Sequence, residues 1–408
     1  MSTFQIIIIA SVIIILSYLF NVIAKRTNIP SVLMLIVLGV VIHQGMMHFG
    51  LSKDPLMPAL EVLGNVGLIM IVLEAAIDLE LKREKWPIIW KSLLIALLAL
   101  IGSAFACAFI IHFFIIEDKF TALLYAIPLS IMSSAIIIPS VGGLVADKKE
   151  FMVYESTFSD ILGIMFFYFM LGNADATSAN EIVSDVLINI LLTISLSIII
   201  SYVLIWIFQQ LESQVKLFLL ISVLLLLYAI GKIFHLSSLV IILVFGLVLN
   251  NTRVFFMGSL KKMINQKAIN KILHDFHIVI GESAFAVRTF FFVIFGISIN
   301  LSLLLNLEVA VISSLIVLAL YVVRFIFLKL FLWRDIVPQL YIAPRGLITI
   351  LLFFAIPVEF QSDAFAPSIL LYTIILTSLV MTISLIKEGK RGEAKEEVLS
   401  EINSTDKS

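Results

Sequence analysis

The chain has 408 residues and a net charge of −1, with 61% hydrophobic and only 13% charged residues. A water-soluble domain has about 25% charged residues, so this composition excludes an ordinary soluble protein and indicates a chain surrounded mostly by lipid. The near-zero net charge gives no reason to expect a nucleic-acid partner, and the single cysteine, Cys107, excludes an intrachain disulfide.

Apolar segments that could cross a bilayer occur thirteen times along the chain. A helix needs about 20 apolar residues to cross the hydrocarbon core. Backbone groups in lipid must form their hydrogen bonds within the segment, so these segments are expected to be helices and the fold class an all-α polytopic membrane protein. The predicted spans are residues 4–24, 31–48, 57–79, 87–115, 119–145, 151–172, 182–208, 216–233, 236–252, 275–299, 302–330, 336–358 and 366–386.

Basic residues between the spans predict the orientation. Sixteen Lys and Arg residues lie in or beside odd-numbered loops, three lie in even-numbered loops, and five follow the last span. Because basic loops stay on the cytoplasmic side, we expect a multi-pass protein of the cell (inner) membrane with its N-terminus outside. The expected organisation is a transmembrane domain over residues 1–386 and a short cytoplasmic tail over residues 387–408.

Two of the predicted spans contain helix-breaking residues. The span 119–145 holds Pro128 and Pro139 with three serines between them, and the span 336–358 holds the sequence Ala-Pro-Arg-Gly at residues 343–346. Seven crossings separate these spans, so they run antiparallel. Broken helices at matching positions of inverted repeats are typical of secondary transporters, where the breaks form an ion site at the bilayer midplane. Two ordinary proline kinks are the alternative.

The span 151–172 carries an acidic residue deep in the membrane. Asp160 lies about 13 Å from the start of this span, near the middle of the core. Ser156 is four residues earlier on the same helical face, and Ser159 is adjacent. A carboxylate at this depth indicates a functional site. Because removal from water disfavours its charged form, Asp160 can take up a proton or a transported cation in competition; a structural, hydrogen-bonded carboxylate is the alternative.

Further charged residues lie within the predicted spans. Glu155 and Arg345 lie at compatible depths from the cytoplasmic side, which predicts a structural ion pair between them. Glu74 lies near the cytoplasmic end of the span 57–79, where it could assist cation binding on the approach to Asp160 or be solvated by water. The sequence assigns no partner to Glu282, Arg288 or Arg324.

At these residues the chain resembles the monovalent cation:proton antiporter superfamily, which includes the sodium/proton exchangers. The resemblance covers about residues 10–386 and rests on short motifs that follow one another in the family's order on the expected spans. These motifs are Arg26…Pro30-Ser31-Val32-Leu33, Leu73-Glu74-Ala75-Ala76-Ile77, Glu155-Ser156…Ser159-Asp160, Phe290…Gly296 and Ala343-Pro344-Arg345-Gly346.

The resemblance implies a thirteen-helix homodimer, an elevator-like movement of a core domain, and binding of the transported cation and of protons at Asp160. It implies that Ser156 and Glu74 help to form the site and that Glu155 pairs with Arg345. Members with a single midplane carboxylate are generally electroneutral, and Ser159 in place of a second acidic residue puts this chain with them.

Two departures from the family pattern bear on the transported ion. Ser159 stands where the exchanger branch has Asn, and Met132-Ser133-Ser134-Ala135 stands where it has Thr-Asp-Pro. Ser133 and Ser134 therefore join the candidate cation-binding residues. The two serines followed by Ala-Ile-Ile-Ile-Pro look more like the potassium-efflux branch.

The sequence thus predicts a secondary antiporter that exchanges a monovalent cation, Na⁺ or Li⁺, for H⁺, with a role in pH homeostasis. A K⁺/H⁺ antiporter and a cation channel are the alternatives. We expect no enzymatic activity, because Ser133 and Ser134 have no histidine at comparable depth to act as a base. We also expect no cofactor; the predicted partners are monovalent cations, protons, membrane lipid and a second copy of the chain.

Overall fold

The computed structural model of the protein describes residues 3–27, 31–48, 57–172, 179–210, 216–233, 238–257, 261, 264–298, 306–333 and 336–405, and all regular structure in these ranges is helical. Pro30 of the first motif lies outside them. So do the predicted span ends at residues 236–237, 299 and 302–305.

Eleven of the thirteen predicted spans each coincide with one helix. Residues 119–145 form two half-helices, and residues 336–358 contain a short 3₁₀ turn followed by an eight-residue helix. Seven helical segments among the described residues have the length and apolar composition to cross a bilayer. The helices are α1 (Thr3–Thr27), α2 (Ser31–His48), α3 (Met57–Asp78), α4 (Trp86–Phe114), α5 (Lys119–Ser130), α6 (Ser134–Ser140), α7 (Ala146–Gly172), α8 (Ala179–Phe208), α9 (Lys216–Ile233), α10 (Ser238–Asn250), α11 (Thr252–Phe255), α12 (Gln266–Ser298), α14 (Leu307–Leu332), α15 (Leu347–Phe354) and α16 (Ser368–Thr405), with short 3₁₀ turns η2 (Arg83–Lys85), η4 (Gln339–Tyr341) and η5 (Val358–Phe360).

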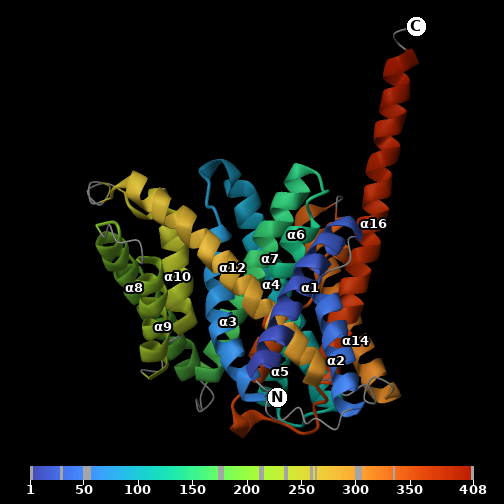
Figure 1. Ribbon diagram of the computed structural model, residues 1–408, viewed down its shortest axis with the longest axis horizontal. Helices are drawn as coiled ribbons and strands as arrows, with labels where there is room; N and C mark the ends of the chain where they lie inside the picture. The colour runs from blue at the N-terminus through green and yellow to red at the C-terminus, as the bar shows by residue number, and fades with distance from the viewer. Residues whose placement is uncertain are drawn as a thin grey trace.

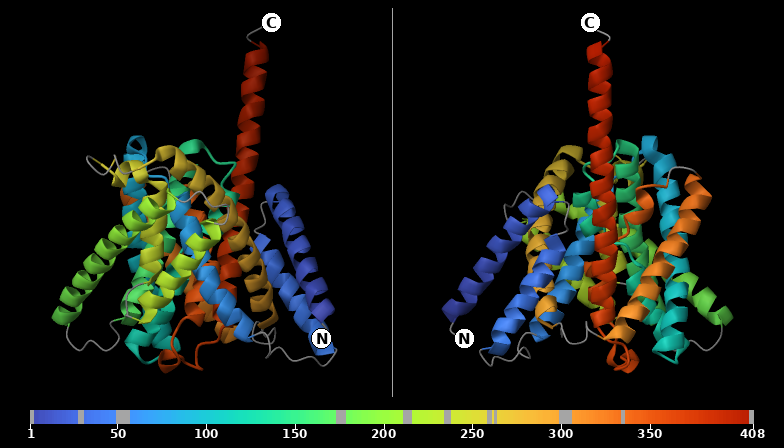
Figure 2. Two further views of the ribbon diagram at one scale, coloured as in Figure 1. Left: turned by 60° about the vertical axis from the view of Figure 1, so that its left-hand side comes forward. Right: turned by 90° about the vertical axis from the view of Figure 1, so that its right-hand side faces the viewer.

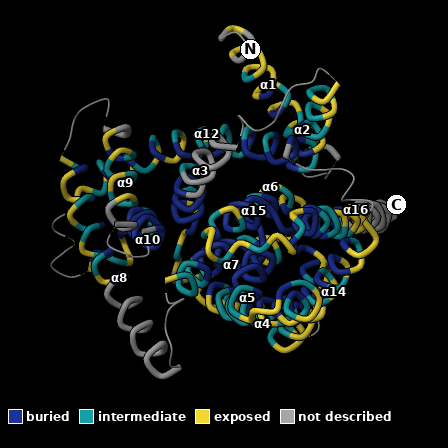
Figure 3. Tube along the Cα trace, turned by 90° about the horizontal axis from the view of Figure 1, so that it is seen from below, coloured by how far each residue is buried: buried dark blue, intermediate teal, exposed yellow. Residues whose placement is uncertain are grey.

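The helices form two groups, which are clearest along the view of Figure 3. A bundle contains α4, α5, α6, α7, α14, α15 and α16, in which α4 packs on α5, α7 and α14. An arc contains α1, α2, α12, α3, α10, α9 and α8, in which α12 packs on α2 and α3 and α10 packs on α3 and α8. Helix α3 also touches α7 and α15, and α10 touches α7, so the arc meets the bundle along α3 and α10.

The bundle consists of two three-span units, and the middle span of each is broken. The first unit is α4, α5 with α6, and α7; the second is α14, η4 with α15, and α16. The helical backbone is interrupted at residues 131–133 and at residues 342–346. The first break lies between Pro128 and Pro139, which are themselves helical. Two broken middle spans confirm the predicted inverted-repeat fold.

Arc helices α2 and α12 cross with their backbones in direct contact. A Cβ atom at Gly39 would overlap the carbonyl oxygen of Val293 and approach Gly296 Cα to 2.8 Å. Helices in lipid associate through this kind of close packing, because hydrocarbon tails remove the hydrophobic drive between apolar faces.

The segment between α3 and α4 is attached to both groups of helices. On the arc side, Asn251 Nδ2 donates to Leu79 O at 2.8 Å, and Asn251 Oδ1 accepts from Leu81 N at 2.6 Å. On the bundle side, the Tyr154 hydroxyl of α7 donates to Glu80 O at 2.8 Å. Three consecutive residues are thus bonded alternately to the arc and to the bundle.

Helix α16 continues beyond residue 386, where the sequence predicts the start of a separate tail. It runs unbroken to Thr405 and projects from the end of the molecule opposite the N-terminus (Figures 1 and 2). The chain is a multi-pass membrane protein whose C-terminal residues extend out of the bundle.

Candidate ion-binding site

The two breaks cross each other in the bundle, and their polar backbone groups are bonded across the crossing. Ser133 N donates to Pro344 O at 3.0 Å, which joins the two broken spans directly. Met132 N donates to Ser159 Oγ of α7, also at 3.0 Å. Irregular backbone at membrane depth needs such partners, because lipid supplies none.

Asp160 of α7 lies beside the same crossing. Its Oδ2 atom accepts a hydrogen bond from Ser134 N at 3.0 Å, and the residue is only 2% exposed. Its Oδ1 atom is buried and has no hydrogen-bond partner among the described residues. A buried carboxylate oxygen without a partner costs free energy, so the site favours binding of a proton or a cation at Oδ1.

Arg345 occupies the carbonyl side of the crossing. Its Nε atom donates to Leu129 O at 2.8 Å and its Nη1 atom to Ala343 O at 2.7 Å. Thr377 Oγ1 of α16 accepts from Arg345 N at 3.0 Å. The guanidinium therefore satisfies carbonyls that the breaks release from helical bonding, and places positive charge at the carboxyl end of α5, where it is stabilised.

The predicted ion pair between Glu155 and Arg345 is wrong, because Glu155 pairs with Arg324 of α14. Arg324 Nη1 and Nη2 donate to the two carboxylate oxygens at 2.7 and 2.9 Å. Arg324 Nη2 also donates to Gln339 O at 2.8 Å. Both side chains are buried. The pair joins α7 to α14 and η4, so it ties together the two units of the bundle.

A cavity of about 550 Å³ separates the arc from the bundle near the crossing. Its wall includes Ser134, whose N–H holds Asp160, together with Glu74 and Asp78 of α3 and Arg288 of α12. It extends past the residues that join α6 to α7, at the end of the molecule from which α16 projects (Figure 1). Water and ions in this cavity reach a residue directly bonded to Asp160.

Glu74 forms an ion pair at the wall of this cavity. Arg288 Nη2 donates to Glu74 Oε1 at 3.1 Å, and each side chain is 21% exposed. The predicted assistance of Glu74 in cation binding stays a prediction, and this carboxylate carries its own positive partner.

Ser133, Ser134, Ser159 and Asp160 lie together at the crossing, and their role in cation binding stays a prediction. Ser156 is also buried on α7, where its hydroxyl donates to Val153 O of the same helix at 3.2 Å. Its role in cation binding stays a prediction.

Sequence reasoning missed Arg324 and Arg288 as ion-pair partners. Arg324 lies eight residues before the end of α14. Its depth in the membrane is therefore similar to the depth of Arg345, on which the predicted pairing with Glu155 is based. Depth alone therefore could not choose between the two arginines. A buried arginine at the depth of a buried glutamate on another span is the signal that points to such a pair.

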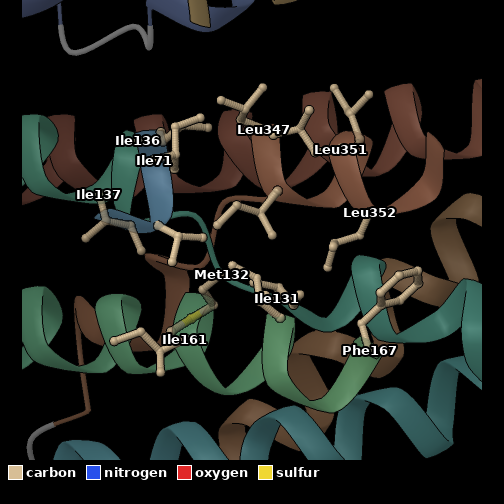
Figure 4. Close-up of a cluster of buried hydrophobic side chains, with 14 of the residues drawn as sticks. Ile71, Ile131, Met132, Ile136, Ile137, Ile161, Phe167, Leu347, Leu351 and Leu352 are labelled. Atoms are coloured by element: carbon tan, nitrogen blue, oxygen red, sulfur yellow. The ribbon is translucent and has the colours of Figure 1, made fainter. Parts of the chain in front are cut away.

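Apolar side chains enclose the crossing between α7 and α15 (Figure 4). Ile131 and Met132 of the first break lie between these two helices and are buried. The other labelled side chains of this cluster are Ile71, Ile136, Ile137, Ile161, Phe167, Leu347, Leu351 and Leu352. Ile71 and Ile136 also line the cavity, and the other side chains of the cluster exclude water from the break. Ser134 is the residue of the cavity wall that bonds Asp160.

Gly346 is required where the second break approaches Ser133. A Cβ atom at this position would lie 2.5 Å from Ser133 Oγ and 2.8 Å from Ser133 Cβ. We expect Gly346→Ala to force the breaks apart at a cost of about 1–3 kcal/mol, seen as a lower melting temperature and slower ion flux. Gly142→Ala is the matched control, because a Cβ at Gly142 meets nothing within 4 Å. Equal melting of the two variants would contradict the close approach.

Comparison with known proteins gives the family of this chain. The model of the family described as "Sodium/hydrogen exchanger, transmembrane" matches residues 9–387. The chain belongs to the sodium/hydrogen exchanger family. This exchanger has the fold of the sodium proton antiporter MjNhaP1 from Methanocaldococcus jannaschii at pH 8, with a TM-score of 0.71 and 19% identity over 96% of this chain and 97% of that one. A second structure of MjNhaP1 matches with a TM-score of 0.66 and 20% identity over the same shares.

No curated protein sequence matches the exchanger. Its family membership identifies it as a cation/proton antiporter.

Proposed function

We propose that this exchanger moves Na⁺ or Li⁺ in one direction and H⁺ in the other, one for one and without net charge movement. The proposal rests on the Oδ1 atom of Asp160, which is buried and has no hydrogen-bond partner within the described ranges. Asp160 is bonded to Ser134, which lines the cavity. Glu155 and Glu74 each pair with an arginine. Asp160, by contrast, pairs with no arginine among the described residues; its donor Ser134, whose main-chain N–H bonds Oδ2, is neutral.

The stoichiometry follows from the number of exchangeable charges at the site. One carboxylate holds either one proton or one monovalent cation, so the loaded site has the same charge in both cases. Binding of both together is disfavoured, because protonation removes the charge that attracts the cation. The alternating exposure that antiport requires is supported by the division into a bundle and an arc, which meet along α3 and α10. No covalent step and no cofactor are needed.

The site also bears on the choice of cation. Residues 131–134 contribute no carboxylate to the crossing, so the cation finds one full negative charge together with neutral oxygens. K⁺ is the alternative substrate, because it loses its hydration water more easily than Na⁺ and so needs less negative charge at the site. The proposed arrangement is a homodimer in the cell membrane, with the N-terminus outside and the cavity open to the cytoplasm. The excess of basic residues in the odd-numbered loops supports this orientation.

Purified protein in liposomes that carry a pH gradient tests the proposal. We expect addition of Na⁺ or Li⁺ to dissipate the gradient, at a rate unchanged when K⁺ and valinomycin set the membrane potential. Faster dissipation by K⁺, measured without valinomycin, would identify a K⁺/H⁺ antiporter. A rate that changes with the membrane potential would contradict electroneutral exchange. A cation current at equal pH on both sides would identify a channel.

A further inference from the structure

Two arginine–carboxylate pairs in the described part of the chain are built differently. Arg324 holds Glu155 through two N–H···O bonds and also donates to Gln339 O, with both side chains out of contact with water. Arg288 holds Glu74 through a single N–H···O contact of 3.1 Å, and both side chains line the water-accessible cavity. A pair of the first kind is fixed, whereas a single contact in a hydrated cavity opens at little cost.

The position of the second pair places it on the route to Asp160. Glu74, Arg288 and Ser134 lie in the wall of the same cavity, and Ser134 bonds Asp160. A cation moving through this cavity therefore passes a carboxylate whose nearest positive charge is a guanidinium.

The remaining charges of the cavity make it attractive to cations. Asp78 also lines the wall, and its partner is His277, at 3.4 Å from Nδ1 to Oδ1. The two carboxylates in the cavity wall outnumber the one guanidinium, and the negative potential concentrates cations there. Arg288 reduces this attraction and competes for one of the carboxylate oxygens.

We propose that Arg288 is a tethered counter-cation of Glu74 that an incoming monovalent cation must displace, so that Arg288 sets the concentration at which the cation enters. The inference rests on the proposed function and adds to it a residue that determines apparent affinity. Because the guanidinium is attached to α12, it cannot diffuse away, and its high effective concentration weakens the binding of any soluble cation at Glu74.

The test measures the apparent KM for Na⁺ and the maximum rate in everted vesicles, in which the cavity side faces the medium. We expect Arg288→Gln to lower the apparent KM about three- to tenfold while the maximum rate changes less. Glu74→Gln leaves Arg288 without its carboxylate and raises the apparent KM. The double variant restores the charge balance and returns the apparent KM to within about threefold of the wild type.

Arg253→Gln is the matched control, because it removes a positive charge from the exposed surface of α11, away from the cavity wall. We expect its apparent KM to equal that of the wild type. A merely structural tie between α3 and α12 would lower the melting temperature and the maximum rate in both single variants without shifting KM in opposite directions, and that result overturns the inference.

Two further outcomes separate this inference from the proposed function. Should Arg288→Gln not accumulate in the membrane, Glu74→Gln decides alone: a raised KM supports the inference, and an unchanged KM overturns it. Flux in the wild type that is lost in Asp160→Asn, combined with an unchanged KM in Arg288→Gln, rejects the inference and leaves the proposed function standing. Absence of Na⁺-driven proton flux in the wild type rejects both.

Discussion

Asp160→Asn is expected to abolish cation-driven proton flux while the protein remains folded. The asparagine side chain has almost the same volume, and its oxygen still accepts from Ser134 N in place of Asp160 Oδ2. It cannot release a proton and carries no charge to attract a cation. Both halves of the exchange are therefore lost. The measurement is Na⁺-induced dissipation of a pH gradient in proteoliposomes, with thermal unfolding of the same preparation.

Asp118→Asn is the control for this change. Asp118 lies at the amino end of α5, where its carboxylate accepts from Thr121 N at 2.7 Å. That bond holds the pKa of Asp118 below its usual range, so the control also removes a full negative charge at neutral pH. Because asparagine is an equally good N-cap, we expect normal transport. Normal transport by Asp160→Asn would show that Asp160 is structural and that the proposed mechanism is wrong.

Glu155→Gln is expected to cause the largest loss of stability. It leaves the Arg324 guanidinium buried without a counter-charge, which costs about 3–5 kcal/mol. Thermal unfolding in detergent measures the loss. Glu150→Gln serves as the control, because Glu150 pairs with Lys85 at 2.6 Å with both side chains about one-third exposed. Such an exposed pair contributes about 0–1 kcal/mol.

A double-mutant cycle identifies the partner of Glu155. Glu155→Gln combined with Arg324→Gln should destabilise less than the sum of the two single changes, because the second removes the charge left by the first. The combination with Arg345→Gln should be additive or nearly so, because Arg345 donates to the carbonyls of Leu129 and Ala343. Coupling to Arg345 in place of Arg324 would contradict the observed geometry.

The spans and the breaks could be predicted because each depends on local sequence. Hydrocarbon thickness fixes the length of a spanning helix. Pro128 and Pro139 weaken the helices in which they lie, and Pro344 and Gly346 stand in the second break itself. The first break nevertheless falls between its prolines, at residues 131–133. The N–H groups of Met132, Ser133 and Ser134 find acceptors in other segments. That position depends on tertiary contacts, which the sequence pattern does not contain.

The neighbours of each span could not be predicted in the same way. Hydropathy and loop charge give the depth and direction of a helix but not which helices lie beside it. Arg324 and Arg345 lie at similar depths, and only the packing of α14 against α4 and α16 brings Arg324 to Glu155. Arg288 meets Glu74 for the same reason, because α12 packs against α3.

The connection between α3 and α4 limits how the two groups of helices can move. Leu79 and Leu81 are bonded to Asn251 of the arc side, and Glu80, between them, is bonded to Tyr154 of the bundle. One residue of extended chain spans at most about 3.6 Å, so the segment has almost no slack. A translation of the bundle along the arc by several ångströms must break one set of these bonds. A rotation of the bundle about this segment keeps the bonds to Asn251 and to Tyr154. In such a rotation the displacement of each bundle residue grows with its distance from the segment.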